Sequence, residues 1–174
     1  MYRQKRSNEN TTVKHSISGN SVNIYRNTKA GQEENMKKFD YSLVKDPQYF
    51  CDGRMEAHSD HMYYRSEEER EDEETSYRHS LNGLWKFHYA RNYASTVAGF
   101  EEDAYSCKDW EDIYVPAHIQ MEGYDVPQYA NVQYPWEGHE ELHPGQIPER
   151  FNPVGSYVKY FHVPENMKGK RVFI

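Results

Sequence analysis

Metal binding is the first chemistry that the sequence suggests, at the five residues His139-Glu140-Glu141-Leu142-His143. They match H-E-x-x-H, in which two histidines four residues apart on a helix bind Zn²⁺ and the glutamate acts as a general base. Gly138 precedes the motif, Pro144-Gly145 follows it, and no amphipathic pattern surrounds it. A helix is therefore not expected here, and we predict a loop without zinc.

A second possible ligand cluster consists of His58, Asp60 and His61 in the segment AHSDH. Zinc sites use about four ligands, and the remaining ligands are not evident, so we expect solvated loop side chains. The sequence has no nucleophile elbow, phosphate-binding glycine loop or dinucleotide fingerprint. Its 28 acidic residues offer no pair with assignable acid and base roles. We therefore predict no metal site and no catalytic residue in this chain.

Asn131 is a lone amide in GYDVPQYANVQYP, residues 123–135, a segment with three tyrosines and two prolines. An asparagine can form a turn by bonding its own backbone. It can also present a donor and an acceptor to a ligand held by the neighbouring rings. The turn is the commoner role, and the residues of this segment alone leave both roles open.

The elements that must position these residues are predicted to be short strands. Residues 84–89, LWKFHY, alternate as in a half-buried strand, with Trp85, Phe87 and Tyr89 on one face. Segments bounded by Pro, Gly, Asp or Asn predict further strands at 113–115, 156–163 and 171–174. Short strands joined by turns and long loops are typical of an all-β sandwich or jelly roll. Because the last predicted strand lies at the end of the chain, we expect an incomplete sheet.

Two further features are interpreted as structural. In Asn152-Pro153-Val154-Gly155, proline fixes φ and glycine permits a positive φ, so the segment is expected to redirect the chain into a strand from Ser156. Trp85 and Trp110 are expected in the core. Trp136 is expected either in the core or at an exposed rim.

Length, charge and composition limit which partners and which cellular compartment we expect for this chain. The chain has 174 residues, too few for a barrel enzyme of about 250. Its net charge of -7 argues against nucleic acid as a partner. No apolar run approaches the roughly 20 residues that span a bilayer, and no signal peptide is evident. Cys51 and Cys107 are expected to be reduced thiols, so we predict a cytoplasmic protein without a membrane partner.

Changes in composition divide the chain into three parts. Residues 1–35 lack periodicity and are expected to be a disordered extension, with Met36 as the natural initiator. Residues 36–75 are expected to be an extended segment with an acidic loop, because the acids of 67–74 repel one another and stay solvated. Residues 76–174 are expected to form the β-domain.

Four aromatic segments together resemble the N-terminal sugar-binding domain of glycoside hydrolase family 2 β-galactosidases. They are LNGLWKFHY (81–89), CKDW (107–110), VPAHIQMEGYDVPQYANVQYP (115–135) and NPVGSYVKYFHVP (152–164). The upstream segment GRMEAHSDH, residues 53–61, resembles the part that precedes this domain in the family. The resemblance covers about residues 36–174.

The resemblance implies a galactose-binding-like jelly roll belonging to an enzyme that cleaves terminal β-D-galactosyl residues, such as that of lactose, with retention. In the family, the Asn of Y-x-N-V-x-Y-P reaches the active site and binds the sugar, so Asn131, with Val132 beside it, is implied as a substrate contact. The two catalytic glutamates lie on a barrel beyond this chain. Mg²⁺ and Na⁺ are implied only for the parent enzyme, which is expected to be a homo-oligomer.

Three functional hypotheses follow. The chain is an N-terminal fragment that supplies the sugar-binding domain and has no glycosidase activity alone; this is the preferred hypothesis. It could instead be a self-standing carbohydrate-binding module, which would need measurable affinity for galactose. In the third hypothesis it complements a defective β-galactosidase by docking at a subunit interface.

Overall fold

The computed structural model describes residues 11–18, 21–26, 40–51, 56–102, 104–127, 131–134, 136–168 and 170–174. The strands are β1 Thr11–Ser18, β2 Ser21–Arg26, β3 Gly83–Ala90, β4 Glu111–Val115 and β5 Val154–Phe161. The helical elements are α1 Glu67–Glu71 and the short 3₁₀ turns Tyr41–Lys45, Tyr93–Ser95 and Glu165–Met167. The described part of the chain is thus a small, mostly β domain.

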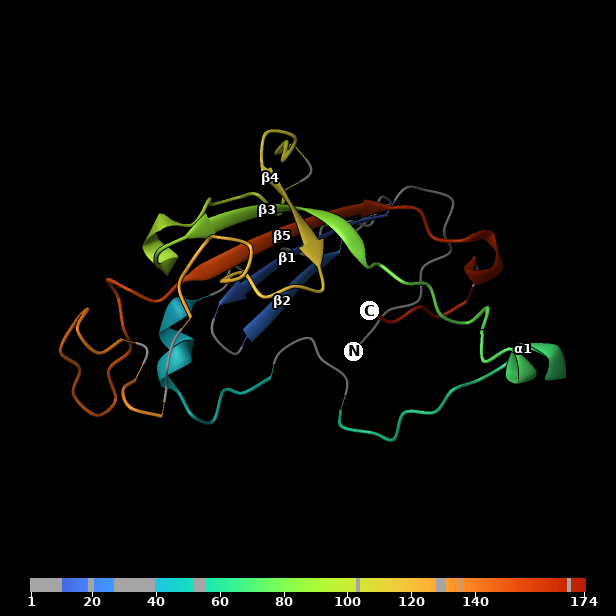
Figure 1. Ribbon diagram of the computed structural model, residues 1–174, viewed down its shortest axis with the longest axis horizontal. Helices are drawn as coiled ribbons and strands as arrows, with labels where there is room; N and C mark the ends of the chain where they lie inside the picture. Colours follow the sequence, from blue (N-terminus) through green and yellow to red (C-terminus); the bar gives the residue numbers. More distant parts are fainter. Residues whose placement is uncertain are drawn as a thin grey trace.

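The five strands form one antiparallel sheet in the order β2-β1-β5-β3-β4 (Figure 1). The predicted strands at 84–89, 113–115 and 156–163 are confirmed as β3, β4 and β5, with bounds that differ by at most two residues. The predicted strand at 171–174 is wrong, because no described strand pairs with it. Phe173 and Ile174 are 47% and 52% exposed, so neither side chain is buried against the sheet.

The structure differs from the expectation of disorder at residues 11–18 and 21–26, where it places β1 and β2. β1 pairs along the whole of β5, from Thr11 opposite Phe161 to Ser18 opposite Val154. β1 thereby gives backbone partners to the side of β5 that faces away from β3. The sequence carries a local signal for this pair, because Val13 and Ile17, and Val22 and Ile24, alternate with polar residues on either side of Gly19-Asn20. The polar composition of residues 1–35 as a whole obscured that signal. Residues 1–10, 27–35 and Met36 lie outside the described residues.

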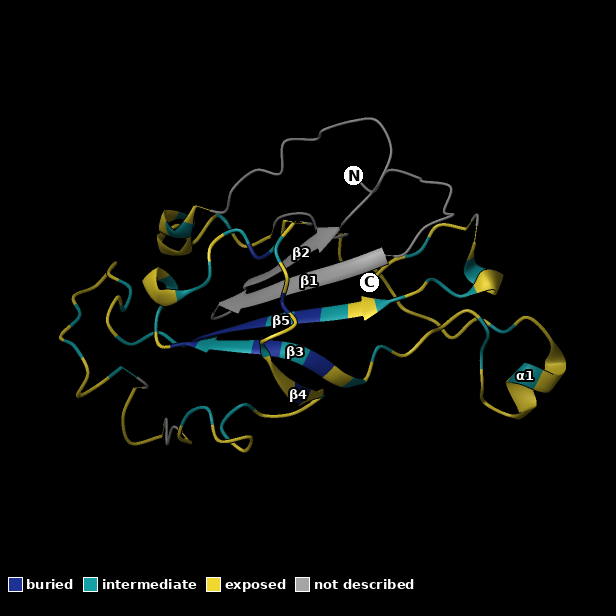
Figure 2. Cartoon of the chain, turned by 90° about the horizontal axis from the view of Figure 1, so that it is seen from above, coloured by how far each residue is buried: buried dark blue, intermediate teal, exposed yellow. Residues whose placement is uncertain are grey.

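One face of the sheet carries the main aromatic core. Trp85, Phe87 and Ile113 are buried there, and Phe87 is only 1% exposed. The ring of Phe87 lies 4.5 Å from that of Tyr124 and 4.7 Å from that of Tyr157, measured between centroids. The predicted alternation of β3 is therefore confirmed, and Figure 2 shows buried positions along β3 and β5.

The other face of the sheet is covered as well. Phe100 and Cys107, from the segment between β3 and β4, pack with Val158 of β5 in a second buried cluster, and Trp110 lies against it. The Trp110 ring is 5.2 Å from the His88 ring. The prediction that Trp85 and Trp110 contribute to the core is confirmed. Cys51 is exposed, Cys107 is buried, and no disulfide joins these two described residues.

Gly155 has a different role from the one predicted. It lies inside β5 without a positive φ, and the strand begins at Val154 rather than Ser156. A Cβ atom at Gly155 would lie 2.9 Å from Cε2 of Phe87 and 3.0 Å from Cε2 of Tyr157. Glycine is therefore needed because two aromatic rings pack directly on the backbone.

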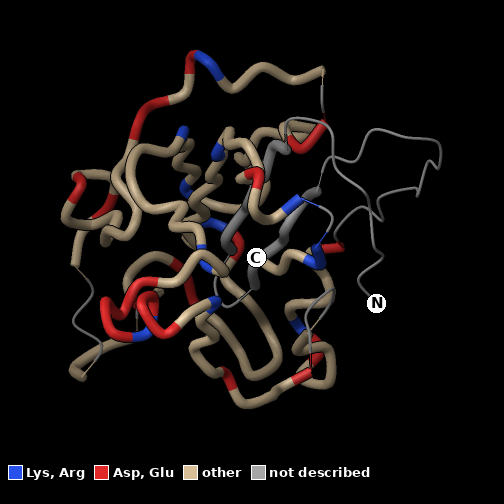
Figure 3. Tube along the Cα trace, turned by 90° about the vertical axis from the view of Figure 1, so that its right-hand side faces the viewer, with Lys and Arg blue, Asp and Glu red and all other residues tan. Residues whose placement is uncertain are grey.

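The acidic run is exposed, as predicted, and part of it forms α1. The Ser66 side chain caps the helix by accepting from the Glu69 N–H at 3.3 Å, and three glutamates occupy the first turn, where the helix dipole favours negative charge. Figure 3 shows Lys and Arg scattered among acidic residues along the trace. No helix in the described ranges has the length and apolar character needed to cross a membrane.

Candidate functional site

The chain that leaves β4 packs directly onto the aromatic core. Ile119 and Tyr124 lie against the cluster around Phe87. Backbone bonds from the Met121 N–H to the His118 carbonyl, 2.9 Å, and from the Tyr124 N–H to the Ile119 carbonyl, 3.2 Å, form a compact turn. The sheet thus fixes this segment shortly before the chain reaches Asn131.

Tyr124 anchors the segment as a neutral side chain. Burial and the hydrogen bond with Glu111 raise the pKa of Tyr124 to about 12. Its ring also stacks on Tyr89, with centroids 6.3 Å apart. Because the phenol is protonated at neutral pH, it acts here as an aromatic packing group with one polar contact.

Asn131 and Val132 lie at a turn and are both exposed, with Val132 73% exposed. Within the described ranges, no protein group hydrogen-bonds to the Asn131 side chain. An amide has both donor and acceptor groups to offer. An asparagine that forms a turn would accept from a nearby backbone N–H, and no such bond is found among the described residues. The assignment of both residues to substrate binding stays a prediction.

Two aromatic side chains follow Asn131 closely. The rings of Tyr134 and Trp136 are stacked, with centroids 5.3 Å apart and planes 4° from parallel. Tyr134 is 61% exposed, whereas Trp136 is half-buried. Their carbonyl groups accept from the N–H groups of Glu137 and His139, each at 3.0 Å, so both rings are carried by a hydrogen-bonded turn.

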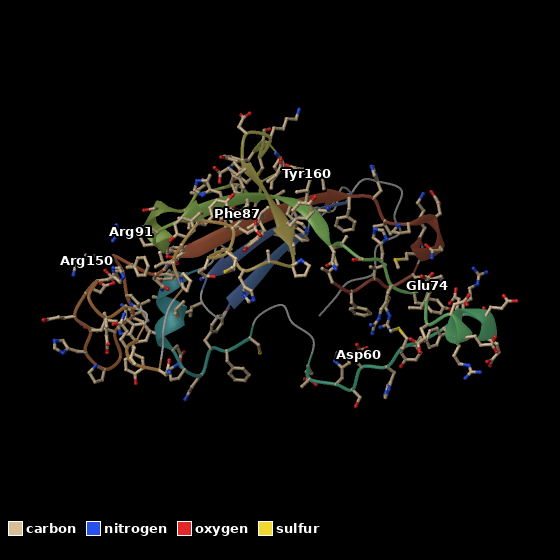
Figure 4. The ribbon with its side chains drawn as sticks, viewed as in Figure 1. Asp60, Glu74, Phe87, Arg91, Arg150 and Tyr160 are labelled. Atoms are coloured by element: carbon tan, nitrogen blue, oxygen red, sulfur yellow. The ribbon has the colours of Figure 1, made fainter. Side chains whose placement is uncertain are left out.

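Residues 136–151 form a loop that is tied to the start of β5. The His139 ring stacks on Phe151 at 3.9 Å, and the Arg91 guanidinium lies 5.6 Å from the Phe151 ring centroid. Oε1 of Glu140 accepts from the N–H groups of Arg150 and Phe151 at 3.0 and 3.3 Å. Figure 4 marks Arg91 and Arg150 at this junction. The loop is therefore held at both ends.

The lowered pKa of Glu140 agrees with this anchoring role. Burial raises its pKa, but the backbone N–H groups of Glu149, Phe151 and Arg150, together with the charge of Arg150, outweigh burial and lower the pKa below its usual value. Oε2 lies 3.9 Å from Nε of Arg150. The carboxylate thus serves as a charged acceptor for the loop.

The H-E-x-x-H residues do not form a helix, as predicted, and their side chains serve separate purposes. His139 stacks on Phe151, Glu140 accepts backbone N–H groups, and the His143 N–H donates to Oε1 of Gln146 at 2.9 Å. The i, i+4 geometry that places two histidines on one face of a helix is therefore missing.

The AHSDH residues also have separate partners. Nδ1 of His58 lies 2.7 Å from the Glu56 carbonyl oxygen, Asp60 pairs with Arg78 at 2.9 Å, and His61 meets the edge of the Tyr63 ring. In the part of the chain that the structure describes, no three His, Cys, Asp or Glu residues gather to hold a metal ion.

Sequence reasoning missed two parts of this region. It found the H-E-x-x-H pattern but not the role of Glu140, whose partners lie ten and eleven residues later. It left Trp136 between core and rim and did not find the stacked pair with Tyr134. The spacing of two aromatic residues around Pro135 was the available signal.

The chain is similar to proteins named β-galactosidase. That of Halalkalibacterium halodurans is 52% identical over 134 residues, 76% of this chain and 13% of that protein. That of Streptococcus thermophilus is 41% identical over 140 residues, 80% of this chain and 14% of that protein. The β-galactosidase large subunit of Latilactobacillus sakei is 40% identical over 140 residues, 74% of this chain and 22% of that protein.

This chain therefore spans only 13% to 22% of the length of these relatives. No solved structure matches it. The family model described as glycosyl hydrolases family 2, sugar binding domain, matches residues 78–174, which include β3, β4, β5 and the loop with Asn131. The chain thus belongs to glycosyl hydrolase family 2, through the sugar binding domain of that family.

Proposed function

We propose that this chain is the sugar-binding domain of a β-galactosidase that hydrolyses terminal non-reducing β-D-galactose residues, such as that of lactose, with retention. One observation carries the proposal. The Asn131 amide is exposed and has no protein partner among the described residues, and it lies in a chain whose relatives are named β-galactosidases.

Asn131 and Val132 would contact the sugar in different ways. The amide can donate to one hydroxyl oxygen and accept from a neighbouring hydroxyl. Val132, 73% exposed, offers an apolar surface to the C–H groups of the sugar. Earlier in the same segment, the ring of Tyr124 packs on Phe87.

Bond cleavage would take place on other parts of the parent enzyme. Retention requires two carboxyl groups about 5 Å apart, one acting as acid and base and the other as nucleophile. We assign neither role to this chain, which would be inactive alone. Mg²⁺, Na⁺ and homo-oligomer formation are proposed only for the parent enzyme. A jelly-roll fold and a cytoplasmic location complete the proposal.

A chimeric enzyme tests the proposal. This chain would replace the matching segment of the Halalkalibacterium halodurans β-galactosidase, to which it is 52% identical over 134 residues. We expect the chimera to hydrolyse lactose. Asn131→Ala should lower its kcat/KM about tenfold or more, since the loss of about 1.4 kcal/mol of hydrogen bonding corresponds to tenfold.

Gln133→Ala provides the matched control, because Gln133 is an exposed amide two residues away. It should leave kcat/KM unchanged. Equal losses for Asn131→Ala and Gln133→Ala would contradict a specific sugar contact. Millimolar or tighter galactose binding by the isolated chain would instead favour a self-standing carbohydrate-binding module.

A further inference from the structure

The exposed ring of Tyr134 is a feature that the proposed function does not use. Its stacking on Trp136, with planes 4° from parallel, fixes the orientation of the ring. Trp136 covers part of one face, yet Tyr134 is still 61% exposed. An apolar ring held at this exposure contributes little to a core and remains open to a ligand.

The support beneath this ring pair is rigid. Trp136 is half-buried, and its carbonyl accepts from the N–H groups of His139 and Glu140 at 3.0 and 3.4 Å. Glu140 is in turn bound to the backbone of Arg150 and Phe151, directly before β5. The Tyr134 ring is thus connected to the sheet through a short series of hydrogen bonds and one stacked pair.

The neighbourhood of the ring has the mixed chemistry of a saccharide site. The Asn131 amide, three residues earlier, offers a donor and an acceptor, whereas Tyr134 offers an apolar face with negative electrostatic potential. A galactose ring has hydroxyl groups at its edge and a patch of slightly positive C–H groups on the face opposite its axial hydroxyl. These two surfaces match an amide and an aromatic face.

We propose that Tyr134, supported by Trp136, is a stacking platform for a hexopyranose ring of the β-galactoside substrate. The platform contributes to substrate binding and to preference for sugars that have an apolar face. This inference rests on the proposed function, because it assigns a second contact to the same site. It involves no covalent step.

Steady-state kinetics of the chimera described above test the platform. Tyr134→Ala should raise KM for lactose about three- to tenfold, the range expected for loss of one aromatic contact, and should change kcat little. Tyr134→Phe keeps the ring and should restore the parental KM. If the hydroxyl of Tyr134 had only a structural role, Tyr134→Phe would not restore KM. If Tyr134 only held the backbone in place, kcat would fall as well.

The matched control is Tyr63→Ala. Tyr63 is 67% exposed, similar to Tyr134, but it lies before α1 beside His61. It should leave KM unchanged. The inhibition constant of galactose identifies the ring that stacks: a rise for Tyr134→Ala assigns the platform to the galactosyl ring, and an unchanged value with a higher KM for lactose assigns it to the second sugar.

The two proposals fail in distinguishable ways. An active chimera that is sensitive to Asn131→Ala but not to Tyr134→Ala overturns the platform alone. An active chimera that is insensitive to both substitutions overturns both sugar contacts. If the chimera is inactive, nuclear magnetic resonance titration of the whole chain with methyl β-galactoside decides: shifts of the Asn131 side-chain amide that need a higher galactoside concentration in Tyr134→Ala support the platform, and equal titration midpoints overturn it.

Discussion

The sheet core around Phe87 and the loop region of residues 131–134 and 136–151 are held together by different kinds of interaction. In the core, Phe87 and Ile113 are 1% and 2% exposed and pack in one cluster with Trp85. In the loop, Val132 and Tyr134 are 73% and 61% exposed. Backbone turns, one carboxylate and stacked rings hold the loop in place.

The difference separates stability from recognition. Apolar burial is strong but leaves nothing exposed for a ligand. Hydrogen-bonded turns and caps contribute little net free energy each, yet they fix a backbone while leaving side chains open to solvent. Substitutions in the core should therefore change the free energy of unfolding, and substitutions in the loop should change local structure and binding.

Phe87→Ala should have the largest effect. It removes a buried ring that contacts Tyr124 and Tyr157, and the expected loss is about 3–5 kcal/mol. That is a large part of the roughly 5–15 kcal/mol typical of a domain. Urea unfolding of the whole chain, followed by circular dichroism, measures it.

Phe173→Ala is the control for this prediction. Phe173 is 47% exposed and lies outside both buried clusters. Its removal should change the free energy of unfolding by no more than about 0.5 kcal/mol. Similar losses for the two phenylalanines would show that the described core does not dominate stability.

Gly155→Ala should have an intermediate effect. The added Cβ would lie 2.9 Å from the Phe87 ring, so ring or strand must shift, at a cost of about 1–3 kcal/mol. The same substitution should cost less in a Phe87→Leu background, where the ring is gone. Urea unfolding measures the loss of unfolding free energy caused by Gly155→Ala in both backgrounds. Equal losses would argue against a clash with Phe87.

The parts of this fold that the sequence predicted are those with a local pattern. The alternation of Trp85 and Phe87 identified β3, because each strand residue faces the core or the other face in turn. The strand predicted at 171–174 was inferred from its apolar residues, but no described strand pairs with it. β1 and β2 were missed although Val13, Ile17, Val22 and Ile24 alternate around Gly19-Asn20, because the polar composition of residues 1–35 was given more weight than this local pattern.

The candidate site was predicted only where a motif or a resemblance marked it. Asn131 was assigned to sugar binding through Y-x-N-V-x-Y-P, whose residues are adjacent in sequence, and this assignment stays a prediction. The anchoring of the loop by Glu140 depends on contacts with Arg150 and Phe151, and no spacing rule relates these positions. Long-range contacts of this kind are determined by the fold and not by a local pattern.

Glu140→Gln should have the smallest and most local effect. An amide oxygen is a weaker acceptor than a carboxylate, so hydrogen exchange at the Arg150 and Phe151 N–H groups should become severalfold faster while the core amides of β3 keep their protection. Glu141→Gln, an exposed neighbour, should change neither set. Faster exchange throughout β3 would mean that the loop and the core do not open independently of each other.

The same contact predicts a pH dependence. The pKa of Glu140 is lower in the folded chain than its ordinary value of about 4.3. The contact therefore contributes fully above that ordinary value and is lost as pH falls through the lowered pKa. Parental exchange at Arg150 and Phe151, corrected for intrinsic rates, should approach that of Glu140→Gln on acidification. Parallel profiles that never converge would show that the charge of Glu140 does not hold the loop.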